Sequence, residues 1–119
     1  MKRIVIEAIT PEQARLPAYS VMGCGDWWRE NGTLNIRVVG DDLDEEGFLI
    51  ALHELVEERL CAIAGVPQQE VDDFDAQFCG DGEPGDDIAA PYREQHRKAM
   101  IIEHLMAVFM GIKGYGRIE

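Results

Sequence analysis

The sequence lacks several features that would assign a protein class directly. No apolar run reaches the length of a membrane-spanning helix, and the start, MKRIVIEAIT, lacks the apolar stretch of a signal peptide. Ser20 is the only serine, and the chain contains no Walker loop, GxGxxG motif or GxSxG elbow. These absences argue against a membrane protein and exclude serine-based catalysis.

Cysteine is also scarce. The three cysteines, Cys24, Cys61 and Cys79, are an odd number, lie far apart and form no CxxC pair. A secreted domain stapled by disulfides would carry an even set at closer spacing. We therefore expect a protein of a reducing compartment, the cytoplasm.

Basic residues are outnumbered two to one. The chain has 11 Lys and Arg against 23 Asp and Glu, which gives a formal net charge of −12. A field of this sign repels the phosphate backbone and argues against direct nucleic-acid binding. It suits solubility, cation binding, or contact with a basic protein partner.

What the chain does contain predicts one α+β domain over residues 1–119. In chain order we expect a strand, a β-hairpin, three helices and a tail, at 2–9, 26–39, 44–64, 71–78, 91–111 and 113–119. The strand and the hairpin should form a small antiparallel sheet that packs on the two long helices. Exposed strand edges and a methionine-rich last helix also suit a homodimer.

The hairpin prediction depends on Asn31-Gly32, the strongest two-residue turn signal. In the register that this turn sets, Trp27 lies opposite Ile36, on the face that should be buried. The same register places Asp26 opposite Arg37, and we expect a surface ion pair between them.

The two long helices carry polar residues on stripes that should face the core. His53 and Glu57 are one helical turn apart on the first, and His96 and Glu103 share one face of the last. Buried charges need partners or a metal. If the helices pack together, these four side chains supply nitrogen and oxygen ligands for a divalent metal. Zinc fits best, with manganese or iron as alternatives.

The alternative is a metal-free network of two His–Glu pairs, in which each imidazole donates a hydrogen bond to a carboxylate. Such networks shift pKa values without any catalysis. The sequence leaves both readings open.

The segment His53-Glu54-Leu55-Val56-Glu57 resembles the HExxH helix of the zincin metallopeptidases, with Glu57 in place of the second histidine. The resemblance implies that His53 and Glu57 hold zinc, and that His96 or Glu103 adds a ligand. It also implies that Glu54 is the general base that activates water. A hairpin ahead of the helix is compatible with a minimal zincin-like architecture.

A second resemblance covers nearly the whole chain. The strings GDWW, HELVE, LC, VDxFD, EPGD and APYxxxH are similar to those of a group of small, functionally uncharacterised bacteriophage and prophage proteins. This resemblance implies a phage or prophage origin and a bacterial host cytoplasm. It implies no reaction.

Three functions follow from these observations. The first is a zincin-like, metal-dependent hydrolase with Glu54 as its catalytic residue. The second is a non-enzymatic acidic accessory protein that binds a host factor and uses the His–Glu cluster structurally. The third is a Mg²⁺-dependent nucleotide pyrophosphatase, suggested by Glu54, Glu57 and Glu103, although a second acidic motif is missing and the strands do not fit.

Overall fold

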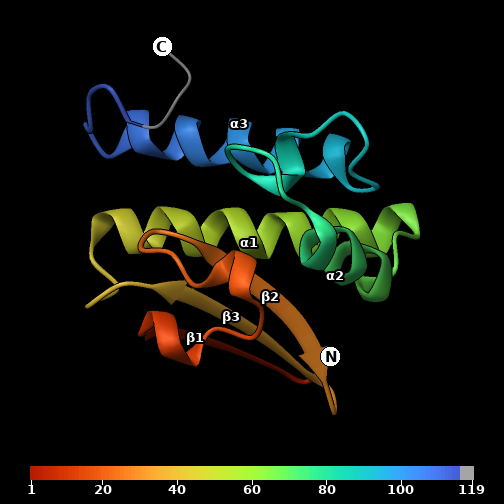
Figure 1. The fold of residues 1–119 in the computed structure, drawn as a ribbon. Helices are drawn as coiled ribbons and strands as arrows, with labels where there is room; N and C mark the ends of the chain where they lie inside the picture. Colours follow the sequence, from red (N-terminus) through yellow and green to blue (C-terminus); the bar gives the residue numbers. More distant parts are fainter. Residues whose placement is uncertain (116–119) are drawn as a thin grey trace.

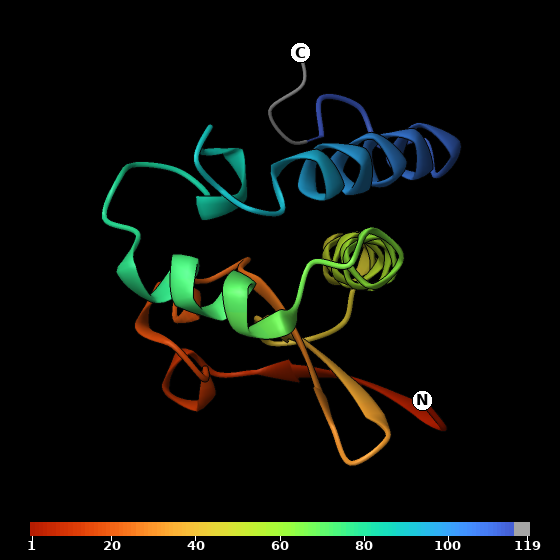
Figure 2. The same cartoon turned by 90° about the vertical axis from the view of Figure 1, so that its right-hand side faces the viewer.

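The structure, a computed structural model, describes residues 1–115 and stacks its elements in layers (Figure 1). Figure 2 looks along the central helix α1 (Glu45–Ala64), with α3 (Arg93–Phe109) on one side and the sheet on the other. The shorter helix α2 (Gln68–Gln77) lies beside α1. The α+β class expected from the sequence is confirmed. Of the predicted tail, residues 116–119 lie outside the described residues.

The sheet contains β1 (Arg3–Ile9), β2 (Gly25–Glu30) and β3 (Thr33–Val39) in the order β1-β3-β2. β2 pairs antiparallel with β3, but β1 pairs parallel with β3, so the expected antiparallel sheet is wrong and the sheet is mixed. The reason is the connection: residues 10–24 make two short 3-10 turns and carry the chain across β3 before β2 begins. A parallel neighbour needs such a crossover, because a tight turn joins only antiparallel strands.

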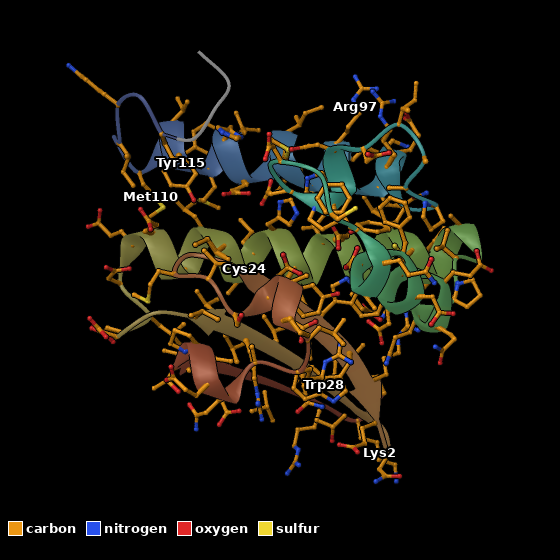
Figure 3. All side chains as sticks on the ribbon, in the orientation of Figure 1. Lys2, Cys24, Trp28, Arg97, Met110 and Tyr115 are labelled. Atoms are coloured by element: carbon orange, nitrogen blue, oxygen red, sulfur yellow. The ribbon has the colours of Figure 1, made fainter. Side chains whose placement is uncertain are left out.

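The hairpin forms as its turn signal predicts. Asn31 and Gly32 both adopt positive φ angles, 51° and 77°, and Trp27 pairs with Ile36. Trp27 and Ile36 are both buried against α1. Trp28 lies on the opposite face of the sheet, away from α1 (Figure 3), between the guanidinium groups of Arg15 and Arg37.

Helix α1 is bounded by strong local signals. The Asp44 side chain accepts a hydrogen bond from the Gly47 N–H at 2.9 Å, and two glutamates follow in the first turn, where they complement the helix dipole. Gly65 ends the helix in the left-handed conformation, with a φ of 76°. Because α1 has a layer on each side, it buries residues around most of its circumference.

Arg15, in the crossover segment 10–24, binds one aspartate of β2 and one of α2. Its guanidinium makes paired hydrogen bonds to Asp26, at 2.8 and 2.9 Å, and to Asp72, at 3.1 and 3.2 Å. The expected ion pair between Asp26 and Arg37 is therefore wrong, although the two residues do lie opposite each other. Asp26 is 7% exposed and needs the closer, bidentate partner, while Arg37 pairs with Glu7.

Helix α3 attaches to the molecule through small and polar residues. The side chains that it buries are His96, Ala99 and Ala107, whereas its outer face exposes apolar residues. Within residues 1–115, no helix is long and apolar enough to cross a membrane. All three cysteines are free, as their spacing predicts.

Replacing Arg15 with alanine should lower the free energy of unfolding by about 3 kcal/mol, because Asp26 then stays buried without a cation. Urea denaturation measures this change. Arg97→Ala is the matched control, since its pair with Glu94 is exposed, and it should cost less than about 0.5 kcal/mol. Equal effects of the two variants would contradict the role given to Arg15.

Candidate metal centre

Three of the predicted ligands meet between α1 and α3. His53 Nε2 lies 3.2 Å from Glu57 Oε2 and 3.2 Å from His96 Nδ1, and His96 Nδ1 lies 2.9 Å from the same Glu57 oxygen. All three side chains are buried, each 5% exposed or less. Each offers one ligand atom, and the three atoms can reach a common metal ion.

Glu103, the fourth predicted ligand, lies outside this group. Its Oε1 contacts His53 Nδ1 at 2.8 Å, on the ring edge that faces away from Glu57 and His96. Its Oε2 accepts a hydrogen bond from the Tyr115 hydroxyl at 2.7 Å. The His53 Nδ1–H therefore donates to Glu103, which fixes the orientation of the ring with Nε2 directed toward Glu57 and His96.

His96 also has carboxylates on the side of its ring that faces away from Glu57. Its Nε2 faces the acidic loop, 3.1 Å from Asp86 Oδ1 and 3.5 Å from Glu83 Oε2, while its Nδ1 faces Glu57. The loop can come this close because residue 85 is glycine: a Cβ there would lie 2.5 Å from the imidazole. The two histidines thus present different ring nitrogens, Nε2 of His53 and Nδ1 of His96, to the same Glu57 oxygen.

The remaining oxygen of Glu57 has a partner of its own. The Trp27 indole N–H donates to Glu57 Oε1 at 3.0 Å, from the buried face of β2. This bond leaves Oε2 as the atom that faces the two histidines. Trp27 was predicted to be buried, but its link to Glu57 crosses from sheet to helix and has no signal in the sequence.

Glu54 lies beside the group without belonging to it. It is 9% exposed, and its carboxylate is 3.9 Å from His53 Nε2. Among residues 1–115 it accepts no hydrogen bond. Gly25 makes room for this side chain, since a Cβ at that position would lie 2.7 Å from Glu54 Cγ. Glu54 is thus a buried carboxylate that has space next to it and no donor.

The electrostatics follow from this geometry. Burial lowers the pKa of His53, but its hydrogen bonds to Glu103 and Glu57 outweigh burial and raise it to about 11. Burial likewise opposes the ionisation of Glu57, yet the two histidines lower its pKa to about 2. Burial, followed by the charge of Glu57, raises the pKa of Glu54 well above its usual range.

Two cavities meet at Glu54. A small one of about 50 Å³ is lined by Glu54, Glu57 and His96 and has room for a few water molecules. A larger one of about 450 Å³ is lined by His53, Glu54 and Glu103. The two share Gly25, Glu54 and Glu83 in their walls, so a molecule in the larger cavity lies next to the buried group.

A second buried polar cluster adjoins the small cavity. The Asp75 carboxylate accepts hydrogen bonds from the hydroxyl groups of Tyr19 and Tyr92. Burial raises the pKa of Asp75 to about 6, although the two tyrosines act in the opposite direction. The sequence gives no sign of this cluster, because its members come from three separate segments.

His104, the third histidine, takes no part in either cluster. Its Nδ1–H donates to the Met100 carbonyl oxygen of the same helix at 2.7 Å.

Comparison with models of protein families, with curated proteins and with solved structures found no match. The resemblances to zincins and to phage proteins therefore stay predictions.

Asp75 predicts a pH dependence of stability. Its pKa is raised on folding from 3.8 to about 6, so between these values the folded protein binds more protons than the unfolded chain. The contribution of Asp75 to the free energy of unfolding therefore falls as pH rises through this window, by up to about 3 kcal/mol.

Asp75→Asn removes this titration. Relative to the wild type, the variant should gain stability as the pH is raised from 4 to 7, as measured by urea denaturation at a series of pH values. Asp73→Asn, an exposed change in the same helix, should show no such trend. Parallel curves for wild type and Asp75→Asn would refute the assignment.

Proposed function

We propose that the protein is a divalent-metal-dependent hydrolase in which His53, Glu57 and His96 hold zinc and Glu54 is the general base. The observation that carries the proposal is the triangle of ligand atoms. Its sides are 2.9, 3.2 and 3.2 Å. Ligand atoms of a tetrahedral zinc ion, with bonds of about 2.0–2.1 Å, lie about 3.3 Å apart. The three side chains thus already have the spacing that zinc requires.

The hydrogen bonds around the triangle support a metal in a second way. Metal-binding histidines characteristically donate their other N–H to a carboxylate, which sets the tautomer and the ring orientation. Here Glu103 receives that bond from His53, and Asp86 faces the corresponding nitrogen of His96. Both free lone pairs then point to the same place.

A metal-free network of the same atoms is the competing interpretation. It would place two imidazoles against one Glu57 oxygen, with His53 Nε2 and His96 Nδ1 only 3.2 Å apart, so that protonation of both rings brings two N–H donors together. A cation between them removes this repulsion, because both nitrogens then act as acceptors. The chemistry of the donor set, two imidazoles and a carboxylate, matches zinc sites that catalyse hydrolysis.

The position of Glu54 favours catalysis over a purely structural site. His53, Glu57 and His96 would hold the zinc ion, which would supply a water of lowered pKa at its remaining position. Glu54 is close enough to receive a proton from that water and has no other hydrogen bond to give up among residues 1–115. For an amide, the water oxygen would bond to the carbonyl carbon while the C–N bond breaks, and Glu54 would carry the proton of the water to the leaving nitrogen.

One observation favours a second candidate function, the binding of a host protein by a non-enzymatic accessory protein. Apolar side chains are exposed along the outer face of α3: Ile101, Leu105, Val108 and Phe109. Such a stripe is typical of a protein interface. In that case the His–Glu centre would be structural, and it would bind metal without hydrolysing any substrate.

Metal binding is the first prediction of this proposal. Elemental mass spectrometry of the untagged protein should find about one zinc, manganese or iron per chain, and His53→Ala should remove it. His104→Ala is the matched control and should retain the metal, because His104 bonds to its own helix. Glu103→Gln should weaken metal affinity about 10- to 100-fold in a chelator competition assay, as loss of an outer partner does.

The same measurements can contradict the proposed metal site. A protein without metal, in which His53→Ala only lowers the unfolding temperature, would establish the metal-free network and overturn the hydrolase.

The role of Glu54 gives the second prediction. Glu54→Gln should keep the metal and lower kcat about 10²- to 10⁴-fold on whichever substrate a peptide and nucleotide screen identifies, because the base is lost. Glu58→Gln is not a suitable control, since Glu58 pairs with Arg29 at 2.8 Å; Glu45→Gln, exposed on the same helix, serves instead. Full activity of Glu54→Gln would contradict the assignment of Glu54 as the general base.

A further inference from the structure

The outer edge of β1 is a free border of the sheet. β1 and β2 are the two outer strands, because β3 lies between them (Figure 1). The edge of β2 meets α2, where the Arg29 N–H donates to Gln68 Oε1 at 2.7 Å. Among residues 1–115, β3 is the only strand that pairs with β1. An edge strand directs alternate N–H and C=O groups away from its sheet, where they can pair with another chain.

The apolar side chains of β1 are incompletely covered as well. Ile4 lies beside Leu34 in the register of β1 with β3, and Ile6 lies beside Ile36. The two β3 residues have no exposed surface, whereas Ile4 is 45% exposed and Ile6 is 42% exposed. Helix α1 packs over β2 and β3, so the outer strand receives less cover. A further strand along the free edge would shield both isoleucines.

The order of residues along β1 is self-complementary. In an antiparallel pair of β1 strands with the two-fold axis at Val5, Arg3 of one copy lies opposite Glu7 of the other. Ile4 then lies opposite Ile6 on the other face. Unlike charges and apolar side chains are thus each matched across the strands, which stabilises a sheet. Moving the axis by one residue in either direction would instead place Arg3 or Glu7 opposite Val5.

The charges near this edge allow two copies to approach, although the whole chain carries −12. Residues 2–9 contain two basic side chains, Lys2 and Arg3, and one acidic side chain, Glu7. Glu7 already pairs with Arg37, whose Nε lies 3.4 Å from its Oε1, but the Glu7 side chain is 50% exposed. A carboxylate accepts several hydrogen bonds, so Glu7 can receive Arg3 of a second copy while it keeps Arg37.

We propose that the protein forms a symmetric dimer in which two β1 strands pair antiparallel about Val5 and join the two sheets into one. A pairing of this length makes a small interface, so the dissociation constant should be about 1–100 µM. The proposal is independent of the hydrolase, because the His–Glu centre lies on the side of α1 that faces α3, away from the sheet (Figure 2).

Sedimentation equilibrium across this concentration range, on protein without an N-terminal tag, tests for the dimer. Arg3→Glu should weaken dimerisation at least about tenfold, because it sets two carboxylates against each other at both ends of the pairing. Lys98→Glu is the matched control. It makes the same change in net charge at an exposed position of α3, away from the edge, and should leave the dissociation constant within about twofold.

Disulfide cross-linking tests the register. The Cα atoms of two directly opposed residues in an antiparallel pair lie about 4.5–5.5 Å apart, within the range that a disulfide spans. Val5→Cys should therefore give a covalent dimer on mild oxidation. Arg3→Cys is the control, since its two copies would lie about 13 Å apart along the strands. Cys79, which is exposed and free, is replaced by serine in every variant of this experiment.

Three results would overturn the proposal. The first is a monomer throughout the concentration range. The second is a dimer that Arg3→Glu and Lys98→Glu weaken equally, because net charge rather than strand pairing would then explain the effect. The third is a dimer in which Val5→Cys cross-links no faster than Arg3→Cys. That dimer would use another surface, such as the exposed apolar face of α3.

Discussion

The burial of α1 on two sides is the constraint on which the rest of the structure depends. A helix with one buried face can leave its charges in water, but α1 has the sheet on one side and α3 on the other (Figure 2). His53, Glu54, Glu57 and Glu58 are consequently all buried. Each buried charge must find a partner or cost several kcal/mol, so much of the surrounding structure supplies such partners.

Those partners come from every layer of the molecule. Trp27 reaches Glu57 from the sheet, Arg29 reaches Glu58 from the same strand, and Glu103 reaches His53 from α3. The histidines and Glu57 are therefore oriented by groups that no ligand has to displace. A site held in this way needs little rearrangement to take up a metal, and the proposed centre is preorganised in that sense.

Local signals in the sequence predicted the parts of the structure that depend on neighbouring residues. Asn31-Gly32 set the hairpin register, and the spacing of His53 and Glu57 placed both on one helix face. Contacts between distant segments left no such signal. The parallel pairing of β1, the bond between Arg15 and Asp26, and the side of His53 on which Glu103 lies all depend on how finished elements pack, which periodicity does not encode.

The way α3 is attached has a consequence for cooperativity. Its fully buried side chains are two alanines and a histidine, and its methionines are only half-buried, whereas the sheet and α1 share a core of large buried side chains. Elements held by little buried apolar surface open at lower free energy than the core. We expect α3 to detach as a separate cooperative unit while the sheet and α1 stay folded. Docking of α3 and assembly of the His–Glu centre would then be one and the same event.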